Sequence, residues 1–353
     1  MLVYIILSLA AIVANLFGII QPGSKRSRVS LIVAWGLFLL IVGLRYHHGD
    51  YGGYEEAFYL DKDISGDEGY FMIQKVFHSV IPSFVTFVFV VTLISVFCFK
   101  KIFSLLPCAA FGLVMVLGKL FTMYAMSGVR QYLAMAICWW GLYESLAKDK
   151  DKYFILSVVV AYTIHGSALV FFPVIIFKYM RFTFVRALLV TGAAWAAFEI
   201  INPIILSSTE DNELFYRMQD YLISDGSGTM NMLNYLENGL FLTLAILCRR
   251  RAIKVIPYYD CFLFIYLVYF VFLLLGSEFG IFKRLRDYYA IGYAFICPGF
   301  MLIFKNKDMQ RVVYLVLVLY FIFLMFRSFS VFDSGLPAVE GRMVPYHSIF
   351  QYL

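Results

Sequence analysis

The chain has 353 residues, of which 62% are hydrophobic and only 15% are charged, and its mean hydropathy is +0.81. A soluble domain of this length has no core large enough to hide so much apolar surface, which excludes an ordinary soluble protein. The formal net charge of +6 is concentrated between apolar runs, so it indicates orientation in a membrane and not nucleic-acid binding.

Apolar runs long enough to cross a bilayer follow one another along the whole chain. The first run has no basic residue ahead of it and no small-residue cleavage pattern, which is typical of a retained span. We therefore predict an all-α polytopic membrane protein with about 11 to 12 transmembrane segments. The runs cover residues 2–20, 29–45, 82–99, 103–126, 131–147, 187–206, 232–248, 258–276, 285–304 and 309–329, with an unusual run at 153–177.

Basic and acidic residues separate between the connections. Segment 46–81 has seven acidic and two basic residues, and segment 207–231 has five acidic and one basic. By the positive-inside rule these two loops and the tail 330–353 lie at the outer face, as caps on one membrane domain that spans residues 1–353. The basic, cytoplasmic connections are 25–28, 100–101, 148–152, 178–186, 249–254 and 305–311.

Segment 153–177 disturbs this alternation, because both of its flanks are basic. A single span there would invert every later loop. Glycine weakens a helix, and polar groups are costly against lipid, so the string Ile164-His165-Gly166-Ser167 predicts a bend. We expect a bent or re-entrant segment whose turn points outward.

The stretch from Gly43 to Tyr54 is the densest group of polar residues at the end of an apolar run. It contains Arg45, His47, His48 and Asp50, together with three tyrosines. Ionisable residues at such a boundary are candidates for function. No cysteine, histidine or carboxylate lies at a metal-like spacing from the two histidines, so we expect no metal.

Other unusual polar residues open spans from the same, outer face. Arg130 and Gln131 begin one span, and Arg284 begins another. Such arginines break the positive-inside rule, so pairing with a carboxylate or a ligand must offset their cost. Three guanidiniums near tyrosines suit an anionic group with several oxygens, such as the pyrophosphate of a lipid. Tyr51 and Tyr54, with their aromatic rings, fit either an interfacial belt or stacking on sugars.

The order of these motifs resembles that of the EpsG family of Wzy-type polysaccharide polymerases. The similarity runs from residue 44 to residue 346, and the His47-His48 pair departs from the family's pattern. The matching strings are Leu44-Arg45-Tyr46, Gly49-Asp50-Tyr51 with Tyr54, Glu68-Gly69, Gly128-Val129-Arg130-Gln131-Tyr132-Leu133-Ala134, His165-Gly166-Ser167-Ala168-Leu169, Arg284-Leu285 with Tyr288-Tyr289, and Val344-Pro345-Tyr346.

The resemblance implies a fold like that of multispan, metal-independent lipid-linked glycosyltransferases, with no cofactor. It implies polymerisation of oligosaccharide repeat units carried on undecaprenyl pyrophosphate, at the outer face of a bacterial cytoplasmic membrane. The product is an exopolysaccharide, a capsule or an O-antigen. A chain-length regulator protein is a further candidate partner besides the lipid-linked substrate and the bilayer. The alternatives left open are an O-antigen-type ligase and a flippase or transporter of the same lipid.

A glycosyl transfer assigns roles to these residues. Guanidiniums near the leaving pyrophosphate stabilise the charge that develops there. The expected catalytic bases are Asp50, His165 and Glu68, with Asp50 placed first because neighbouring glycines allow close approach of a ligand. The expected substrate- and pyrophosphate-binding residues are Arg45, Arg130, Gln131, Arg284, Tyr51, Tyr54, Tyr288 and Tyr289.

Overall fold

A computed structural model describes residues 1–60, 67–207, 232–275, 280–334 and 341–351. Within these ranges the regular elements are helices, as the sequence predicts. The chain forms two compact units. The first unit holds residues 1–169 and 304–353, and the second holds residues 170–303. That both units belong to a single membrane domain, as the sequence predicts, stays a prediction.

The first two helices of the first unit, α1 (Leu2–Ile20) and α2 (Lys25–Gly43), pack against each other. A tight turn joins them because the hydroxyl of Ser24 caps α2, accepting a hydrogen bond from the amide of Ser27 at 3.1 Å. Lys25 and Arg26 follow this cap. Helix α2 therefore begins at Lys25, four residues before residue 29, where the second apolar run was expected to start.

The core of the first unit contains α5 (Phe84–Phe103), α6 (Ala110–Lys119), a short π-helix η1 (Phe121–Ala125), α7 (Val129–Lys148) and α16 (Lys307–Ser334). Trp139 of α7 is fully buried and packs on Phe99 of α5 at a ring distance of 5.1 Å. Asn15 of α1 links two other helices, since its side chain donates to Ala110 O and accepts from the hydroxyl of Tyr314. Satisfied polar groups of this kind fix the register of packed helices.

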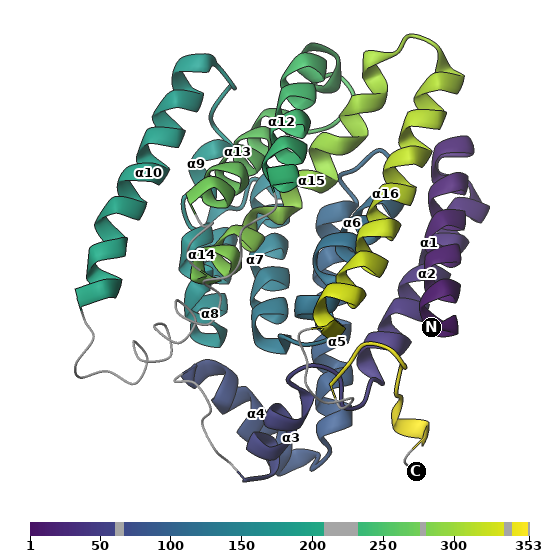
Figure 1. Ribbon diagram of the computed structural model, residues 1–353, viewed down its shortest axis with the longest axis vertical. Helices are drawn as coiled ribbons and strands as arrows, with labels where there is room; N and C mark the ends of the chain where they lie inside the picture. The colour runs from purple at the N-terminus through teal and green to yellow at the C-terminus, as the bar shows by residue number, and fades with distance from the viewer. Residues whose placement is uncertain (61–66, 208–231, 276–279, 335–340, 352–353) are drawn as a thin grey trace. The chain divides into compact units, whose positions relative to one another are not determined.

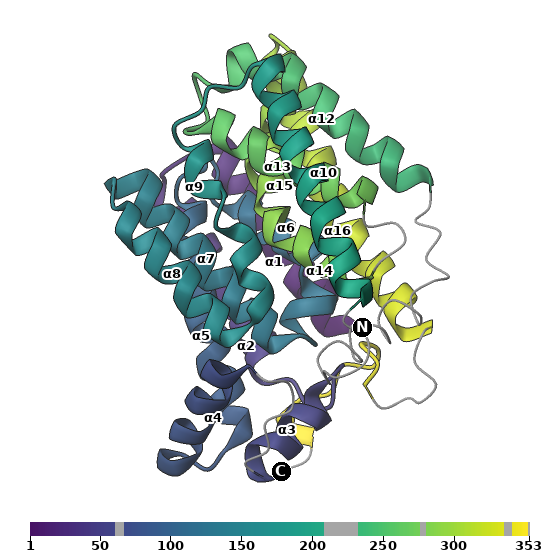
Figure 2. The same ribbon diagram turned by 90° about the vertical axis from the view of Figure 1, so that its left-hand side faces the viewer.

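The connection between α2 and α5 is largely helical. It contains α3 (Tyr51–Leu60) and α4 (Glu68–Val80), which lie at the same end of the first unit as the short 3-10 helix Ile349–Gln351 (Figure 1, Figure 2). Tyr70 and Gln74, one helical turn apart, are the buried residues of α4. The described part of segment 46–81, which the sequence predicts to be an outer-face loop, therefore contains two helices.

Helix α8 (Asp151–Ile164) packs along α7 and ends at the predicted bend. His165 is extended, with φ −156° and ψ 114°, and a 3-10 helix, η2 (Gly166–Phe171), follows. The break thus falls within the string expected from the sequence. The orientation of this bend in a membrane stays a prediction.

The tail after α16 folds back onto residues 44–49, which follow α2. Helix α16 continues to Ser334, five residues beyond the expected end of the last span. The described part of the tail, residues 341–351, includes the short 3-10 helix η5 (Ile349–Gln351). Its backbone pairs with residues 44–49 through isolated bridges between Arg45 and Ser348 and between His48 and Gly341.

The second unit is built around α13 (Tyr259–Leu275), which packs against α10 (Phe184–Ser207) and α12 (Met232–Ala252). Arg249 forms a two-pronged ion pair with Asp260, with both distances at 2.6 Å. The expected outer loop 207–231 lies almost entirely outside the described residues. The remaining helices are α9 (Val174–Phe177), α14 (Gly280–Asp287), η3 (Tyr288–Ala290), α15 (Ile291–Ile296) and η4 (Cys297–Ile303).

Among the described residues, four helices are long and apolar enough to cross a membrane: α1, α2, α5 and α16. Shorter apolar helices accompany them, including α6 and α13. This is the architecture of a polytopic membrane protein. The exact number of spans stays a prediction.

Candidate functional site

Arg45 is held at the end of α2 by two main-chain carbonyls. Its Nε atom donates to Met126 O at 2.9 Å, and its Nη1 atom donates to Val42 O at 2.5 Å. Only 1% of the residue is exposed, and this burial lowers the pKa of Arg45 to about 10. The guanidinium remains charged at neutral pH, because that value is still far above 7.

Asp50 lies just after the turn at Gly49, where φ is +58°. Its Oδ2 atom accepts a hydrogen bond from the hydroxyl of Ser127 at 3.1 Å, and its amide donates to the same hydroxyl at 3.3 Å. The side chain is exposed. Ser127 therefore positions a carboxylate that remains accessible at the start of α3.

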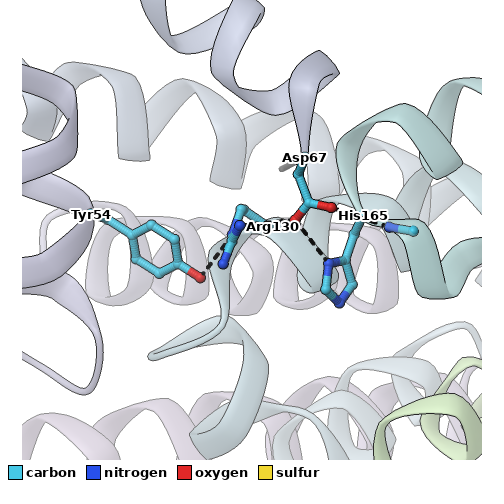
Figure 3. Close-up of polar contacts among 5 residues, drawn as sticks. Tyr54, Asp67, Arg130 and His165 are labelled. Atoms are coloured by element: carbon cyan, nitrogen blue, oxygen red, sulfur yellow. Dashed lines mark hydrogen bonds and ion pairs between the residues drawn. The ribbon is translucent and has the colours of Figure 1, made fainter. Parts of the chain in front are cut away.

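Asp67 joins two of the predicted site residues, Arg130 and His165 (Figure 3). Its Oδ2 atom lies 2.8 Å from Nη1 of Arg130 and 3.2 Å from Nδ1 of His165. Its Oδ1 atom accepts from the amide of Gly166 at 3.3 Å. Because α4, α7 and the bend after α8 each supply one member, only the folded chain assembles this group.

Burial by itself raises the pKa of Asp67, but its partners reverse that effect. The hydrogen bond and charge of His165, the charge of Arg130 and the Gly166 amide together hold the pKa of this carboxyl below its usual value. Asp67 is therefore ionised at neutral pH. Since a carboxylate can only accept, Nδ1 of His165 carries a proton in this pair, and the neutral form of the ring has its lone pair on Nε2.

Tyr54 completes this group on the other side of Arg130. The Nε atom of Arg130 donates to the Tyr54 hydroxyl at 3.2 Å, and the guanidinium lies over the Tyr54 ring at 5.2 Å. The Tyr70 ring lies 5.9 Å from the same guanidinium. Two aromatic faces and a carboxylate thus fix the plane of Arg130.

His48, whose role the sequence left open, fastens the C-terminal tail. Its Nδ1 atom donates to Arg342 O at 2.6 Å, and its Nε2 atom accepts from the amide of His347 at 3.0 Å. These partners require a neutral ring. Burial lowers the pKa of His48 to about 4, which favours the same form. His47 adopts a φ of +53° and packs its ring on Tyr46 at 4.0 Å.

The first unit therefore brings together most of the predicted site: Arg45, Asp50, Tyr51, Tyr54, Arg130 and His165. Gln131 is buried in the first turn of α7, and Glu68 is exposed in the first turn of α4.

Arg284, Tyr288 and Tyr289 belong to the second unit. Arg284 is half-buried on α14, and both tyrosines are buried in η3, where the hydroxyl of Tyr289 donates to Val170 O. The neighbouring Arg286 pairs with Asp287 at 3.0 Å.

Sequence reasoning missed Asp67, Ser127 and the tyrosines Tyr70 and Tyr132. Asp67 precedes an amphipathic helix, a position where a capping role is the ordinary explanation. Its carboxylate makes no capping hydrogen bond in the structure. The available signal was a second acidic residue directly before Glu68, in the acidic segment 46–81.

Within the described residues, no group of three or more histidine, cysteine, aspartate or glutamate side chains is arranged to hold a metal ion. The described cysteines are also all free thiols. The side chains that meet at the site carry guanidinium, carboxylate, imidazole and phenol groups.

The fold and the site define a polytopic, all-helical membrane protein with arginine, histidine and carboxylate groups assembled at one end of its first unit. The sequence pattern of the EpsG family matches residues 28–348. The chain belongs to the EpsG family, which is associated with Wzy-like polymerases of polysaccharides. No curated protein and no solved structure matches the chain.

Proposed function

We propose that this protein polymerises undecaprenyl-pyrophosphate-linked oligosaccharide repeat units at the outer face of the bacterial cytoplasmic membrane. The observation that carries the proposal is the contact of Asp67 with both His165 and Arg130, which sets a base beside an anion-binding group. Membership of the EpsG family supports the same class of reaction.

The proposed reaction is a glycosyl transfer. An acceptor sugar hydroxyl attacks the anomeric carbon of a lipid-linked donor chain, and a new C–O bond forms. The bond between that carbon and the pyrophosphate oxygen breaks, and its electron pair leaves with the lipid pyrophosphate. The proton of the attacking hydroxyl passes to a base of the protein.

His165 is the base that the geometry favours. Asp67 accepts from Nδ1, so the lone pair of Nε2 is directed away from the carboxylate, and Nε2 makes no hydrogen bond within the described residues. Asp67 also stabilises the imidazolium that forms when His165 takes the proton. This pairing supports His165 ahead of Asp50, which the sequence put first and which has no acidic or basic orienting partner of this kind within the described residues.

Arg45 and Arg130 are proposed to stabilise the departing pyrophosphate. In each arginine, hydrogen bonds fix the Nε and Nη1 atoms, so the planar fork is held before the substrate arrives. Preorganised charge of this kind lowers a barrier because it needs no rearrangement during the reaction. Arg284 is proposed as a third contact on the basis of the sequence.

Reconstitution tests the proposal directly. The purified protein in proteoliposomes is supplied with the lipid-linked repeat unit of its own strain, and the glycan products are separated by size. A ladder of chains longer than one repeat supports a polymerase. Transfer of a single unit to a different acceptor identifies a ligase, and movement of the lipid across the membrane without a new bond identifies a transporter.

A further inference from the structure

Four buried polar atoms of α3, α4 and α7 have no hydrogen-bond partner among the described residues. They are the hydroxyls of Tyr51, Tyr70 and Tyr132 and the Nε2 atom of Gln74. None of these residues is more than 4% exposed. Buried hydroxyls and amides are almost always paired in folded proteins, because an unmade hydrogen bond costs free energy. Four such atoms in one region point to a partner from outside the described chain.

The three phenols all interact electrostatically with one guanidinium, that of Arg45. The charge of Arg45 acts on Tyr51, Tyr70 and Tyr132, which come from α3, α4 and α7. The rings of Tyr51 and Tyr70 pack on the first turn of α5, at 4.9 Å from Phe84 and 5.8 Å from Phe87. Gln74 lies one helical turn after Tyr70 on the buried side of α4. We call Tyr51, Tyr70, Gln74 and Tyr132 the tyrosine cluster.

The tyrosine cluster adjoins the proposed catalytic group. The Tyr70 ring lies 5.9 Å from the Arg130 guanidinium and 6.2 Å from the Tyr54 ring. Arg130 in turn contacts Asp67, which holds His165. A ligand bound at the cluster lies next to the residues that are proposed to transfer the sugar.

The chemistry of the tyrosine cluster favours a hydroxyl-rich, neutral ligand. Phenol and amide groups both donate and accept, as sugar hydroxyls do, whereas a phosphate needs donors alone. Burial raises the pKa of the Tyr51 and Tyr70 phenols, so they stay protonated. Aromatic rings also offer a face for the apolar side of a sugar.

We propose that the tyrosine cluster is a subsite that binds one sugar residue of the repeat unit through the Tyr51, Tyr70 and Tyr132 hydroxyls and the Gln74 amide. The inference rests on the proposed function, because it takes the substrate to be an oligosaccharide. It goes further by assigning sugar recognition to Tyr70, Gln74 and Tyr132.

The test compares stability and binding in the full-length protein in lipid nanodiscs. The probes are the oligosaccharide released by mild acid from the strain's own lipid-linked repeat unit and, separately, inorganic pyrophosphate. The variant Tyr51→Phe/Tyr70→Phe/Tyr132→Phe removes three hydroxyls and keeps the rings. The matched control is Tyr314→Phe, whose hydroxyl donates to Asn15 at 2.6 Å within the protein.

The oligosaccharide is expected to raise the melting temperature of the wild-type protein, and the triple variant is expected to lose this response. Each lost hydroxyl is expected to weaken binding roughly tenfold. Without the probe, the triple variant should melt at or above the wild-type temperature, because it loses no internal hydrogen bond. Tyr314→Phe should show the reverse, a lower melting temperature with the full response to oligosaccharide.

Two results would overturn the inference. One is a triple variant that binds the oligosaccharide as tightly as the wild type. The other is a wild-type protein that responds to pyrophosphate and not to the oligosaccharide. Because binding is measured without turnover, failure of the subsite is distinguishable from failure of the proposed polymerisation, which the reconstitution measures separately.

Discussion

Nδ1 of His165 lies 3.2 Å from Oδ2 of Asp67, and this contact fixes which imidazole nitrogen carries the proton. The ring presents Nε2 as its basic atom. His165 follows the last turn of α8, and Asp67 precedes the first turn of α4. The two residues are 98 positions apart, so the pairing depends on the packing of α4 against α8.

The first prediction concerns this pair. His165→Ala is expected to lower the rate of polymerisation by roughly 10²- to 10⁴-fold, because a positioned base is lost. Asp67→Asn should cause a smaller loss, since the amide still accepts from Nδ1 but no longer carries the charge that stabilises the imidazolium. Rates are measured with the reconstituted protein and its lipid-linked substrate.

The control for the pair is Glu68→Gln, one residue away and exposed. We expect this variant to polymerise at the wild-type rate. A large loss in Glu68→Gln together with an active His165→Ala protein would contradict the assignment of the base.

The second prediction concerns Arg45. Arg45→Lys keeps the charge but cannot reach both Val42 O and Met126 O with one planar group. We expect the variant to lose about 1–3 kcal/mol of stability for a buried carbonyl left unpaired, together with most of the polymerising activity. Thermal unfolding in detergent measures the first effect. An Arg45→Lys protein with wild-type stability would show that the two carbonyl contacts are unimportant.

The third prediction concerns the turn at Gly49. A Cβ atom at this position meets the Oγ and Cβ atoms of Ser127 at 2.4 and 2.5 Å, and the φ of +58° is unfavourable for an L-residue. Gly49→Ala should destabilise the protein by about 1–3 kcal/mol. It should also displace Asp50 from Ser127.

The matched control is Gly53→Ala, on α3, where a Cβ atom meets nothing within 4 Å. Alanine is a better helix former than glycine, so this variant should be stabilised by about 0.5–1 kcal/mol. Equal effects of the two substitutions in thermal unfolding would contradict the steric explanation.

The fourth prediction is a pH dependence of tail docking. The pKa of His48 falls from 6.5 to about 4 in the folded protein, so the unfolded chain binds more protons between these values. The stability contributed by His48 is therefore complete above pH 6.5 and is lost as the pH falls toward 4. Protonation of Nε2 would turn it into a donor that faces the donating amide of His347, so this hydrogen bond would be lost.

A nitroxide on Phe350→Cys, in a background without the native cysteines, measures this effect through the mobility of the tail. Phe350 is 69% exposed, so the label disturbs little. Mobility is expected to rise on acidification below pH 6.5. With His48→Phe added, the tail should be mobile at every pH, and a label that stays immobile down to pH 4 would contradict the role of His48.

The fifth prediction concerns the bend after α8. Ser167→Cys should react with a membrane-impermeant maleimide from outside the cell, whereas Lys152→Cys and Lys178→Cys should react only from the cytoplasmic side. This pattern follows from the basic flanks of the segment. Labelling of Lys152→Cys and Lys178→Cys from opposite sides would instead show a single crossing.

The sequence by itself determined the membrane class, the succession of helices and the position of the break at His165. Apolar run length, loop charge and glycine placement act locally along the chain, so they can be read without knowledge of contacts. The same is true of the polar residues that open spans, which is why Arg45, Arg130 and His165 were identified as candidates.

Only the tertiary structure decided the partners of these residues. Asp67 rather than Asp50 or Glu68 pairs with Arg130, and the carbonyls of Val42 and Met126 hold Arg45. Such contacts join positions far apart in the chain. A local sequence pattern cannot tell which of several carboxylates in one acidic loop makes the contact. The packing of α4 on α8 selects Asp67 among them, because it brings this carboxylate within hydrogen-bond distance of His165 and Gly166.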